Sequence, residues 1–394
     1  MERRPGTPSL LRELNDRAAL ELLLTGGPLT RAQLGEHTGL SKVTASQLLA
    51  RLEERGLVQV AGEQAGGRGP NATLYGVVPS AAYVAGLHVE QTEVSAGIAD
   101  VTGRVVTEIS VDPDEGRSPV ELVRGAVAAA CASAGLSPDA LQALVIGTPG
   151  VLDPDTGEPR LTVNLPAWHE GVLEALRSDL GRPVRMENDV NLAAMAERAI
   201  GAAAGADDFV LVWIGIGLGL GLVLGGRLHR GVGGAAGEIG YLPVPGVPLA
   251  KNLASPLTGG FQSLIGASVL LPLAAGYGFD ETTAGAAVRA AITAAADGDE
   301  RGSAFLAELA GRVATGVASI CVVLDPGLVV LGGEVGREGG TALAGRVAAE
   351  VGRISPTRPR VVPTGVTGDP VLHGAILAAV EHARGDLLAS VASS

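Results

Sequence analysis

The chain has 394 residues, of which 46 % are hydrophobic, and a formal net charge of −13. This length is enough for two or three domains with a sizeable core. The longest apolar run, residues 210–224, is shorter than the roughly 20 residues of a membrane helix. Cys131 and Cys321 lie in apolar helical patterns, which predicts buried free thiols and argues against a disulfide or a metal site. The charged N-terminus lacks a signal-peptide core, so we expect a cytoplasmic protein without a membrane span.

Residues 29–56 have the pattern of a helix-turn-helix. Thr30, with Gln33 three residues later, is a capping box that starts a helix. Gly39 can end this helix in the left-handed conformation, and Ser41 can cap a second helix that extends to about Arg55. The buried face of the second helix is predicted to be the apolar stripe Ala45, Leu48, Leu49 and Leu52.

The opposite face of the second helix carries side chains that fit the major groove of DNA. They are Ser41, Lys42, Val43, Thr44, Ser46 and Gln47. Gln47 can read adenine, Val43 can touch a thymine methyl, and Lys42 can meet a phosphate. The alternative is a two-helix corner of an ordinary α-domain with a solvated polar face.

Two short strands, residues 58–61 and 73–77, flank a glycine-rich loop at residues 62–71. This order predicts a winged helix whose loop carries one cation, Arg68. An arginine among glycines fits a narrow minor groove, where the potential is most negative. A loose hairpin with a solvated arginine is the alternative. An earlier amphipathic helix is predicted to complete this small core with Leu11, Leu14, Ala18 and Leu22.

From residue 81 the pattern changes to α/β. Residues 1–80 hold nine Lys or Arg and eight Asp or Glu, so the acidic excess lies in residues 81–394 and should stay away from DNA. Strand-like runs at 83–89, 93–100, 104–110 and 143–147, with a helix at 118–134, are followed by a second set at 209–216, 220–224, 227–229 and 328–331. This repeat predicts two α/β lobes with a ligand cleft between them.

Five segments of this region resemble motifs of the ROK family, which joins bacterial sugar kinases and sugar-responsive repressors. They are Ile146-Gly-Thr-Pro-Gly150, Asn164-Leu-Pro-Ala-Trp168, Glu187-Asn-Asp-Val-Asn191, Ala236-Gly-Glu-Ile-Gly240 and Leu331-Gly-Gly-Glu334. A winged helix ahead of such a region is the arrangement of the family's repressors. The predicted fold is therefore α/β, with an N-terminal winged helix-turn-helix (residues 1–80) and a two-lobed, actin-like sugar-kinase fold (residues 81–394).

The resemblance implies a sugar site at Asn164, Asn188, Asp189, Glu238, Tyr241 and Gln262. In a kinase of this family Asp189 would be the general base that takes the proton of a sugar hydroxyl. Tyr241 and Gln262 depart from the histidine and glutamate of the family. The segment between them lacks the family's zinc-binding cysteines, so we expect no metal. Alternatively, Asn188 and Asp189 simply cap a helix that starts near residue 191.

The family's phosphate loop is also altered. Where kinases have Asp-x-Gly-Gly-Thr, this chain has His88-Val-Glu-Gln-Thr92. Glu90 and Gln91 replace glycines that let the backbone approach phosphate, and a carboxylate there repels a polyphosphate. His88 replaces the aspartate expected to position magnesium, and we interpret it as a satisfied histidine at a strand end. We therefore expect no cofactor and no kinase activity, with Asp189 as a vestige of a catalytic base.

The sequence thus favours a transcriptional regulator, more specifically a repressor, that acts as a homodimer or higher homo-oligomer on pseudo-palindromic operator DNA and responds to a sugar or sugar derivative. Two alternatives stay open. One is an ATP-dependent sugar kinase that keeps a DNA-binding domain, which sugar-dependent release of ADP would identify. The other is a DNA-binding protein whose kinase-like fold serves only dimerisation. A sugar-induced thermal shift that is lost in Asp189→Ala would reject it.

Overall fold

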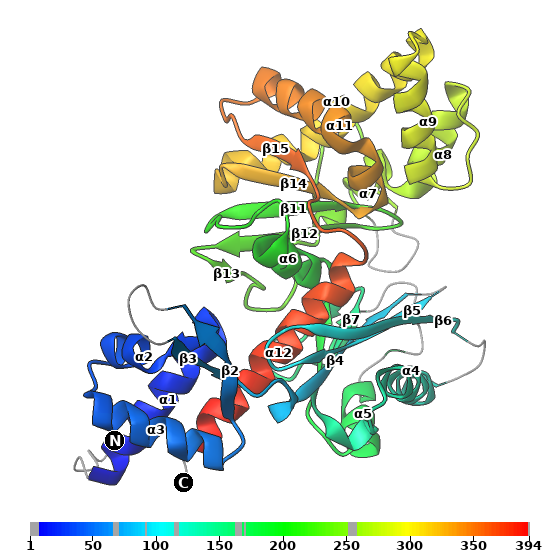
Figure 1. Cartoon of the computed structure of the whole chain (residues 1–394). Coiled ribbons are helices and arrows are strands. Elements are labelled where there is room, and N and C mark those ends of the chain that lie inside the picture. Colours follow the sequence, from blue (N-terminus) through cyan, green and yellow to red (C-terminus); the bar gives the residue numbers. More distant parts are fainter. Residues whose placement is uncertain are drawn as a thin grey trace.

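The computed structural model describes residues 8–65, 71–90, 93–113, 118–161, 168, 171–250 and 258–392. In chain order these residues form a winged-helix head (residues 8–77), a first α/β lobe and a second α/β lobe (Figure 1). The last helix returns from the second lobe, packs on the first lobe and ends beside the head.

The head contains α1 (Pro8–Gly26), β1 (Leu29–Thr30), α2 (Arg31–Thr38), α3 (Lys42–Glu54), β2 (Val58–Gln64) and β3 (Ala72–Val77). Its three strands form an antiparallel sheet in the order β1-β3-β2. The predicted caps are confirmed. Thr30 and Gln33 form a capping box, Gly39 has a φ of 70°, and the Ser41 side chain accepts from the amide of Thr44. The predicted stripe on α3 is also confirmed, since four residues are at most 2 % exposed: Ala45, Leu48, Leu49 and Leu52.

The predicted amphipathic helix is present as α1, but its predicted apolar stripe is wrong at three of four positions, since Leu22 alone of the four packs against the core. Leu11 and Leu14 are 59 % and 53 % exposed, and Ala18 is exposed as well. Apolar side chains lie on two faces of this helix, so the helical period alone does not choose between them. The inner face accepts an aspartate because Arg51 of α3 pairs with it. The residues that α1 buries are Asp16, Ala19, Leu20, Leu23 and Leu24.

The first lobe is built on a five-stranded sheet in the order β10-β7-β4-β5-β6. The strands are β4 (Tyr83–Val89), β5 (Val94–Asp100), β6 (Val105–Val111), β7 (Leu141–Thr148) and β10 (Val184–Asn188). β4, β5 and β6 form an antiparallel meander, whereas β7 and β10 run parallel to β4. One face packs on α4 (Pro119–Ala134) and α5 (Val172–Leu180), and the other on α12 (Pro370–Val391). The short elements are η1 (Pro79–Ala81), η2 (Pro138–Ala140), β8 (Val151–Leu152) and β9 (Pro159–Leu161).

The second lobe repeats this plan with the strand order β13-β12-β11-β14-β15. β11 (Phe209–Ile214), β12 (Leu218–Leu224) and β13 (Arg227–Leu228) are antiparallel, whereas β14 (Leu328–Gly332) and β15 (Arg360–Pro363) run parallel to β11. η3 (Ile239–Tyr241) contacts β12. One face of the sheet is covered by α6 (Asp189–Ile200). The other is covered by α7 (Gln262–Ile265), α8 (Ala267–Gly276), α9 (Ala284–Ala296), α10 (Glu300–Leu324) and α11 (Gly333–Ile354).

α6 and α12 lie between the two sheets and share one hydrophobic core with both (Figure 1). The predicted two-lobed α/β fold is confirmed, with strand ends displaced by a few residues. Cys131 and Cys321 are buried and free, as predicted. By length and composition α10 would also reach across a membrane, but 56 % of its most apolar window is buried inside the fold. Its apolar character is therefore accounted for by the core of the second lobe.

Candidate functional site

The outer face of α3 presents the side chains that were predicted to contact DNA. Three of its hydroxyl groups form hydrogen bonds within the first turns of the helix. Ser41 Oγ lies 2.9 Å from Thr44 Oγ1, and Ser46 Oγ donates to Lys42 O at 2.8 Å. These bonds stabilise the start of the helix. Val43 is 68 % exposed. The exposed side chains that project from this face are Lys42, Val43 and Gln47.

An ion pair that the sequence analysis missed holds α3 against α1. Arg51 Nε donates to Asp16 Oδ2 at 3.0 Å, and its Nη2 lies 2.5 Å from Asp16 Oδ1. The hydrogen bonds that Asp16 accepts from Arg51 raise the pKa of Arg51. Two parallel charge-assisted bonds set orientation as well as distance. The pair therefore fixes how α3 is presented on the head.

Three residues of the predicted sites, Arg68, Gln91 and Asn164, lie outside the described residues. Their roles stay predictions. The strands β2 and β3 that lead into the predicted wing are present, and β2 continues three residues further than expected, to Gln64.

Asn188, at the end of β10, is used to start α6. Its Oδ1 accepts from the amide of Asn191 at 3.0 Å, and its Nδ2 donates to Gly150 O at 3.1 Å. Beside it, Glu187 accepts from Arg230 Nε at 2.6 Å and from Asn191 Nδ2 at 2.9 Å. The interpretation of Asn188 as a helix cap is thus confirmed. Its role as a sugar ligand stays a prediction.

Asp189, the first residue of α6, lies near the carboxylate of Glu238, which precedes η3. Burial raises the pKa of Asp189, and nearby His88 opposes this rise. Burial, and next the charge of Asp189, raise the pKa of Glu238 to about 7. Burial and the charge of Glu238 raise the pKa of Tyr241 as well. The structure therefore brings together Asp189, Glu238 and Tyr241, three residues whose side chains exchange hydrogen bonds with hydroxyl groups.

Gln262 has a different environment from the one expected of a sugar ligand. Its Oε1 accepts from the amide of Leu218 at 3.1 Å, and its Nε2 donates to Ile216 O at 3.1 Å. Both polar ends thus hold the turn between β11 and β12. The role of Gln262 in sugar binding stays a prediction.

His88, next to last in β4, is paired with the residue that starts the last helix. Its Nδ1 lies 2.8 Å from Asp369 Oδ2, and its Nε2 lies 3.7 Å from Glu90 Oε1. Burial alone would lower the pKa of His88, but Asp369, and then Glu90 and Asp189, keep it above its usual value. The interpretation of a satisfied histidine at a strand end is confirmed. Sequence reasoning missed Asp369, although Asp before Pro370 is a helix-start signal that could have marked it.

These charged groups form one neighbourhood contributed by both lobes. We call it the interlobe cluster, and it consists of His88, Glu90, Asp189, Glu238 and Asp369. Three carboxyl groups, those of Asp369, Glu90 and Asp189, lie near the imidazole of His88, and a fourth, Glu238, lies near Asp189. The cluster therefore favours hydroxyl groups or a cation over a phosphate. Among the described residues, no group of three or more His, Cys, Asp or Glu is arranged to hold a metal ion.

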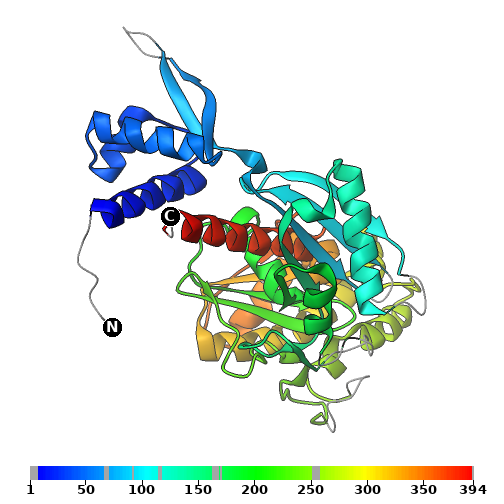
Figure 2. The same ribbon diagram turned by 90° about the horizontal axis from the view of Figure 1, so that it is seen from below.

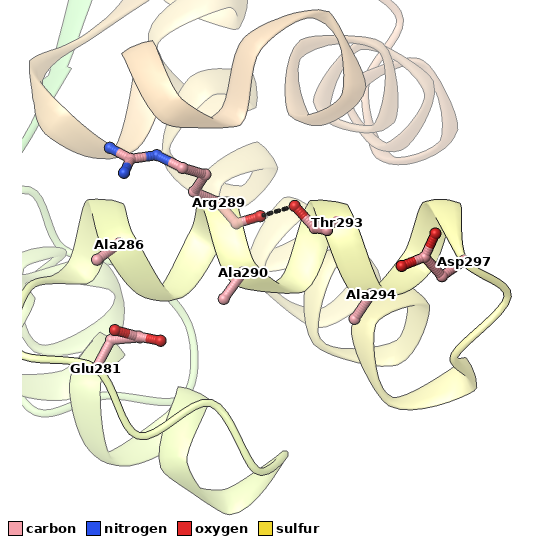
Figure 3. A pocket seen from close by; sticks show the side chains of 7 residues that line it. All are labelled: Glu281, Ala286, Arg289, Ala290, Thr293, Ala294 and Asp297. Atoms are coloured by element: carbon pink, nitrogen blue, oxygen red, sulfur yellow. Dashed lines mark hydrogen bonds between the residues drawn. The ribbon is translucent and has the colours of Figure 1, made fainter.

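A surface hollow of about 500 Å³ lies elsewhere, along α9 (Figure 3). Three alanines of this helix form its floor, and Arg289, at its edge, is bound to Glu338 at 2.6 Å. None of the predicted site residues lines it. An alanine surface beside a paired arginine offers little chemistry, so the interlobe cluster is the candidate ligand site.

Family models match both parts of the chain. Residues 84–375 match the model described as ROK family, and residues 14–69 match the model of the MarR family. The chain is 25 % identical over 337 residues to the DNA-binding transcriptional dual regulator NagC of Escherichia coli K12, which covers 84 % of this chain and 82 % of that protein. It is 24 % identical over 343 residues to a xylose repressor of Caldicellulosiruptor bescii, with 83 % and 84 % covered.

Solved structures have the same architecture. A ROK family transcriptional regulator, described as a homologue of the E. coli MLC protein, has a TM-score of 0.72 at 18 % identity and covers 98 % of this chain and 100 % of its own. The ROK hexokinase of Thermus thermophilus has a TM-score of 0.63 at 30 % identity, with 77 % and 99 % covered. The expected order, a winged helix followed by a sugar-kinase-like fold, is confirmed. The chain belongs to the ROK family.

Proposed function

We propose that this protein is a transcriptional repressor that binds operator DNA through its head and is controlled by a sugar or sugar derivative at the interlobe cluster. The observation that carries the proposal is the fusion of a head with an exposed α3 to a ROK domain. Relatives matched over more than four fifths of the chain are named as transcriptional regulators or repressors. Such a regulator acts in the cytoplasm, where its DNA is.

Three exposed side chains of α3 give the head its means of reading DNA. Gln47 offers an amide that fits the edge of adenine, Val43 offers methyl groups to thymine, and Lys42 offers a charge to phosphate. Two heads in a homodimer would meet the same face of a pseudo-palindromic operator if its half-sites are a whole number of turns apart. We expect a dimer as the simplest such assembly.

Asp189 and Glu238 give the interlobe cluster its means of holding a sugar. With a pKa of about 7, Glu238 can be present either as an acceptor or as a protonated donor near neutral pH. A ligand controls the head only through the difference between its affinities for two arrangements of the protein. A sugar-induced rise in Tm that disappears in Asp189→Ala would support this site. If no sugar of a broad panel changes Tm, the ROK domain serves only assembly.

One observation favours a sugar kinase as the second candidate, namely the retention of Asp189 at the start of α6. The surroundings oppose it. His88 is bonded to Asp369, and Glu90 brings a further carboxylate to the place where the family binds phosphates. ADP release measured with ATP and the same sugar panel distinguishes the two candidates. We expect no sugar-dependent ADP above background.

The test of DNA recognition is binding of the full chain to the DNA upstream of its own gene. We expect selective binding at physiological salt that Gln47→Ala weakens for this sequence more than for unrelated DNA. Lys42→Ala should weaken binding to all DNA sequences. Its matched control is Arg17→Ala, which removes an exposed cation from α1 rather than from α3. Equal binding by the wild type to specific and unrelated DNA would contradict the proposal.

A further inference from the structure

The last helix connects the interlobe cluster to the head. Its 22 residues, at about 1.5 Å each, span about 33 Å. Asp369 of the cluster precedes the first turn of α12, and the last turns of α12 lie beside α1 (Figure 2). α12 is therefore a single rigid element that reaches both proposed functional regions.

At its far end α12 is packed into the head. Leu387 and Val391 belong to the same hydrophobic core as Leu20 and Leu24 of α1. Arg55, which follows α3, donates from Nη2 to Ser390 O at 3.1 Å. The head is thus fixed to the end of α12 as well as to the start of the first lobe. The boundary predicted at residue 80 separates two segments of chain that are packed together here.

In its first two turns, α12 approaches its neighbours so closely that only glycine fits. A Cβ at Gly86 of β4 would lie 2.6 Å from the amide nitrogen of Ile376. A Cβ at Gly374 of α12 itself would lie 2.0 Å from the carbonyl oxygen of Leu192 in α6. A side chain at either position would therefore make backbone contacts below 3 Å, which a small shift of the backbone could not relieve. A displacement at the start of α12 is therefore transmitted along the helix rather than absorbed by loose packing.

At its near end, α12 depends on His88. One oxygen of Asp369 accepts from the amides of Val371 at 2.9 Å and Leu372 at 3.1 Å, so it caps the helix. The other oxygen binds His88 at 2.8 Å. The opposite ring nitrogen of His88 faces Glu90. The same imidazole thus contacts the helix cap on one side and the ligand site on the other.

We propose that His88 is a positioning residue, which holds the start of α12 through Asp369 and thereby sets the position of the head at the other end of this helix. A ligand that hydrogen-bonds Asp189 or Glu90 changes the charges that compete with Asp369 for His88. The strength of the His88–Asp369 pair then depends on occupancy of the site. The inference rests on the proposed function only in assuming that the ligand enters the interlobe cluster.

Hydrogen exchange of the full chain, without DNA or sugar, tests this connection. In Asp369→Asn the side chain can still cap α12, since asparagine is a good cap, but the charge that holds His88 is gone. We expect amides of residues 384–391 and 18–26 to exchange about tenfold faster in Asp369→Asn and in His88→Ala, the loss expected for one charge-assisted bond. A change confined to residues 370–376, or no change, would overturn the inference.

The matched control is His373→Ala, which removes a histidine of α12 whose Nε2 lies 3.0 Å from Glu108 Oε1. In this variant the amides of residues 384–391 and 18–26 should exchange at the same rates as in the wild type. Equal acceleration in His373→Ala would mean that any weakening of α12 loosens the head, and would refute a specific role for His88. Because neither operator nor sugar is present, failure here is distinct from failure of the repressor proposal.

A pH profile separates this role from a purely structural one. His88 faces Asp369 on α12, Glu90 after β4 and Asp189 on α6, which together keep its pKa raised against burial. The charged pair should weaken as pH rises through that raised pKa. After correction for intrinsic rates, wild-type protection at residues 384–391 should fall in this range, and His88→Ala should show no such step. A step of equal size in His88→Ala would contradict the inference.

Discussion

The ion pair between Asp16 and Arg51 should respond unequally to the removal of its two partners. The side chain of Asp16 is 9 % exposed, whereas the side chain of Arg51 is 34 % exposed. In Arg51→Ala a buried carboxylate loses both charge-assisted hydrogen bonds and stays away from water. In Asp16→Ala the guanidinium that is left can turn to solvent. The free energy of unfolding of the head should therefore fall more in the first variant.

We expect Arg51→Ala to destabilise the head by about 3 kcal/mol. This value is at the lower end of the cost of removing one partner of a buried ion pair and leaving the other unpaired. Asp16→Ala should cost about 1 kcal/mol, because a pair that reaches solvent contributes little. The difference of about 2 kcal/mol corresponds to about a thirtyfold difference in the opening equilibrium. Glu21→Ala removes the same charge from an exposed position of α1 and should change stability by less than about 0.5 kcal/mol.

Native-state hydrogen exchange of the buried α3 amides of Leu48 and Leu49 measures this opening directly. We expect their protection to decrease in the order Glu21→Ala, Asp16→Ala, Arg51→Ala, with the last variant the least protected. Equal protection in Asp16→Ala and Arg51→Ala, or lower protection in Asp16→Ala, would refute the argument that burial of the carboxylate decides the asymmetry.

Four further predictions concern DNA and pH. Lys42→Ala should weaken binding to all DNA sequences and lower the salt slope of the binding constant by about 1. Gln47→Ala should reduce the free energy of operator binding by about 1–3 kcal/mol and relax the preference at one base. DNA titrations at several salt concentrations check both. Arg68→Ala should weaken operator binding, and unchanged affinity at physiological salt would exclude its predicted minor-groove role. The pKa of Glu238 is raised from 4.5 to about 7, first by burial and then by the charge of Asp189. Between these two pH values the folded state binds more protons than the unfolded state. The free energy of unfolding should therefore fall as pH rises through this window. Urea unfolding across this range should show a smaller fall in Glu238→Gln, and an identical fall would contradict the assignment.

Local signals in the sequence predicted the head well. The helix caps at the two ends of the turn involve partners only three or four residues away, so each could be identified from its neighbours. Each forms as predicted, at Thr30, Gln33, Gly39 and Ser41. β1 was missed because two residues are too few to show a period. The inner face of α1 was missed because the choice between its two apolar faces depends on Arg51, 35 residues away in sequence.

The candidate site was predicted less completely, since its geometry depends on contacts between distant segments. The motif resemblance led to Asp189 and Glu238, which lie close enough for the charge of Asp189 to raise the pKa of Glu238. It did not reveal that Gln262 is occupied by the backbone of residues 216 and 218. Nor could any local pattern show that Asp369 reaches His88, 281 positions earlier in the chain. Such pairings follow from the order of strands in the sheet rather than from sequence spacing.

The most direct test of a sugar-controlled repressor is a titration of the full chain with DNA from upstream of its own gene, at physiological salt, with and without a panel of sugars. We predict tight, sequence-selective binding that one unphosphorylated sugar or sugar derivative reverses, and loss of this reversal in Asp189→Ala while DNA binding itself is retained. Absence of selective binding in every condition would contradict the account.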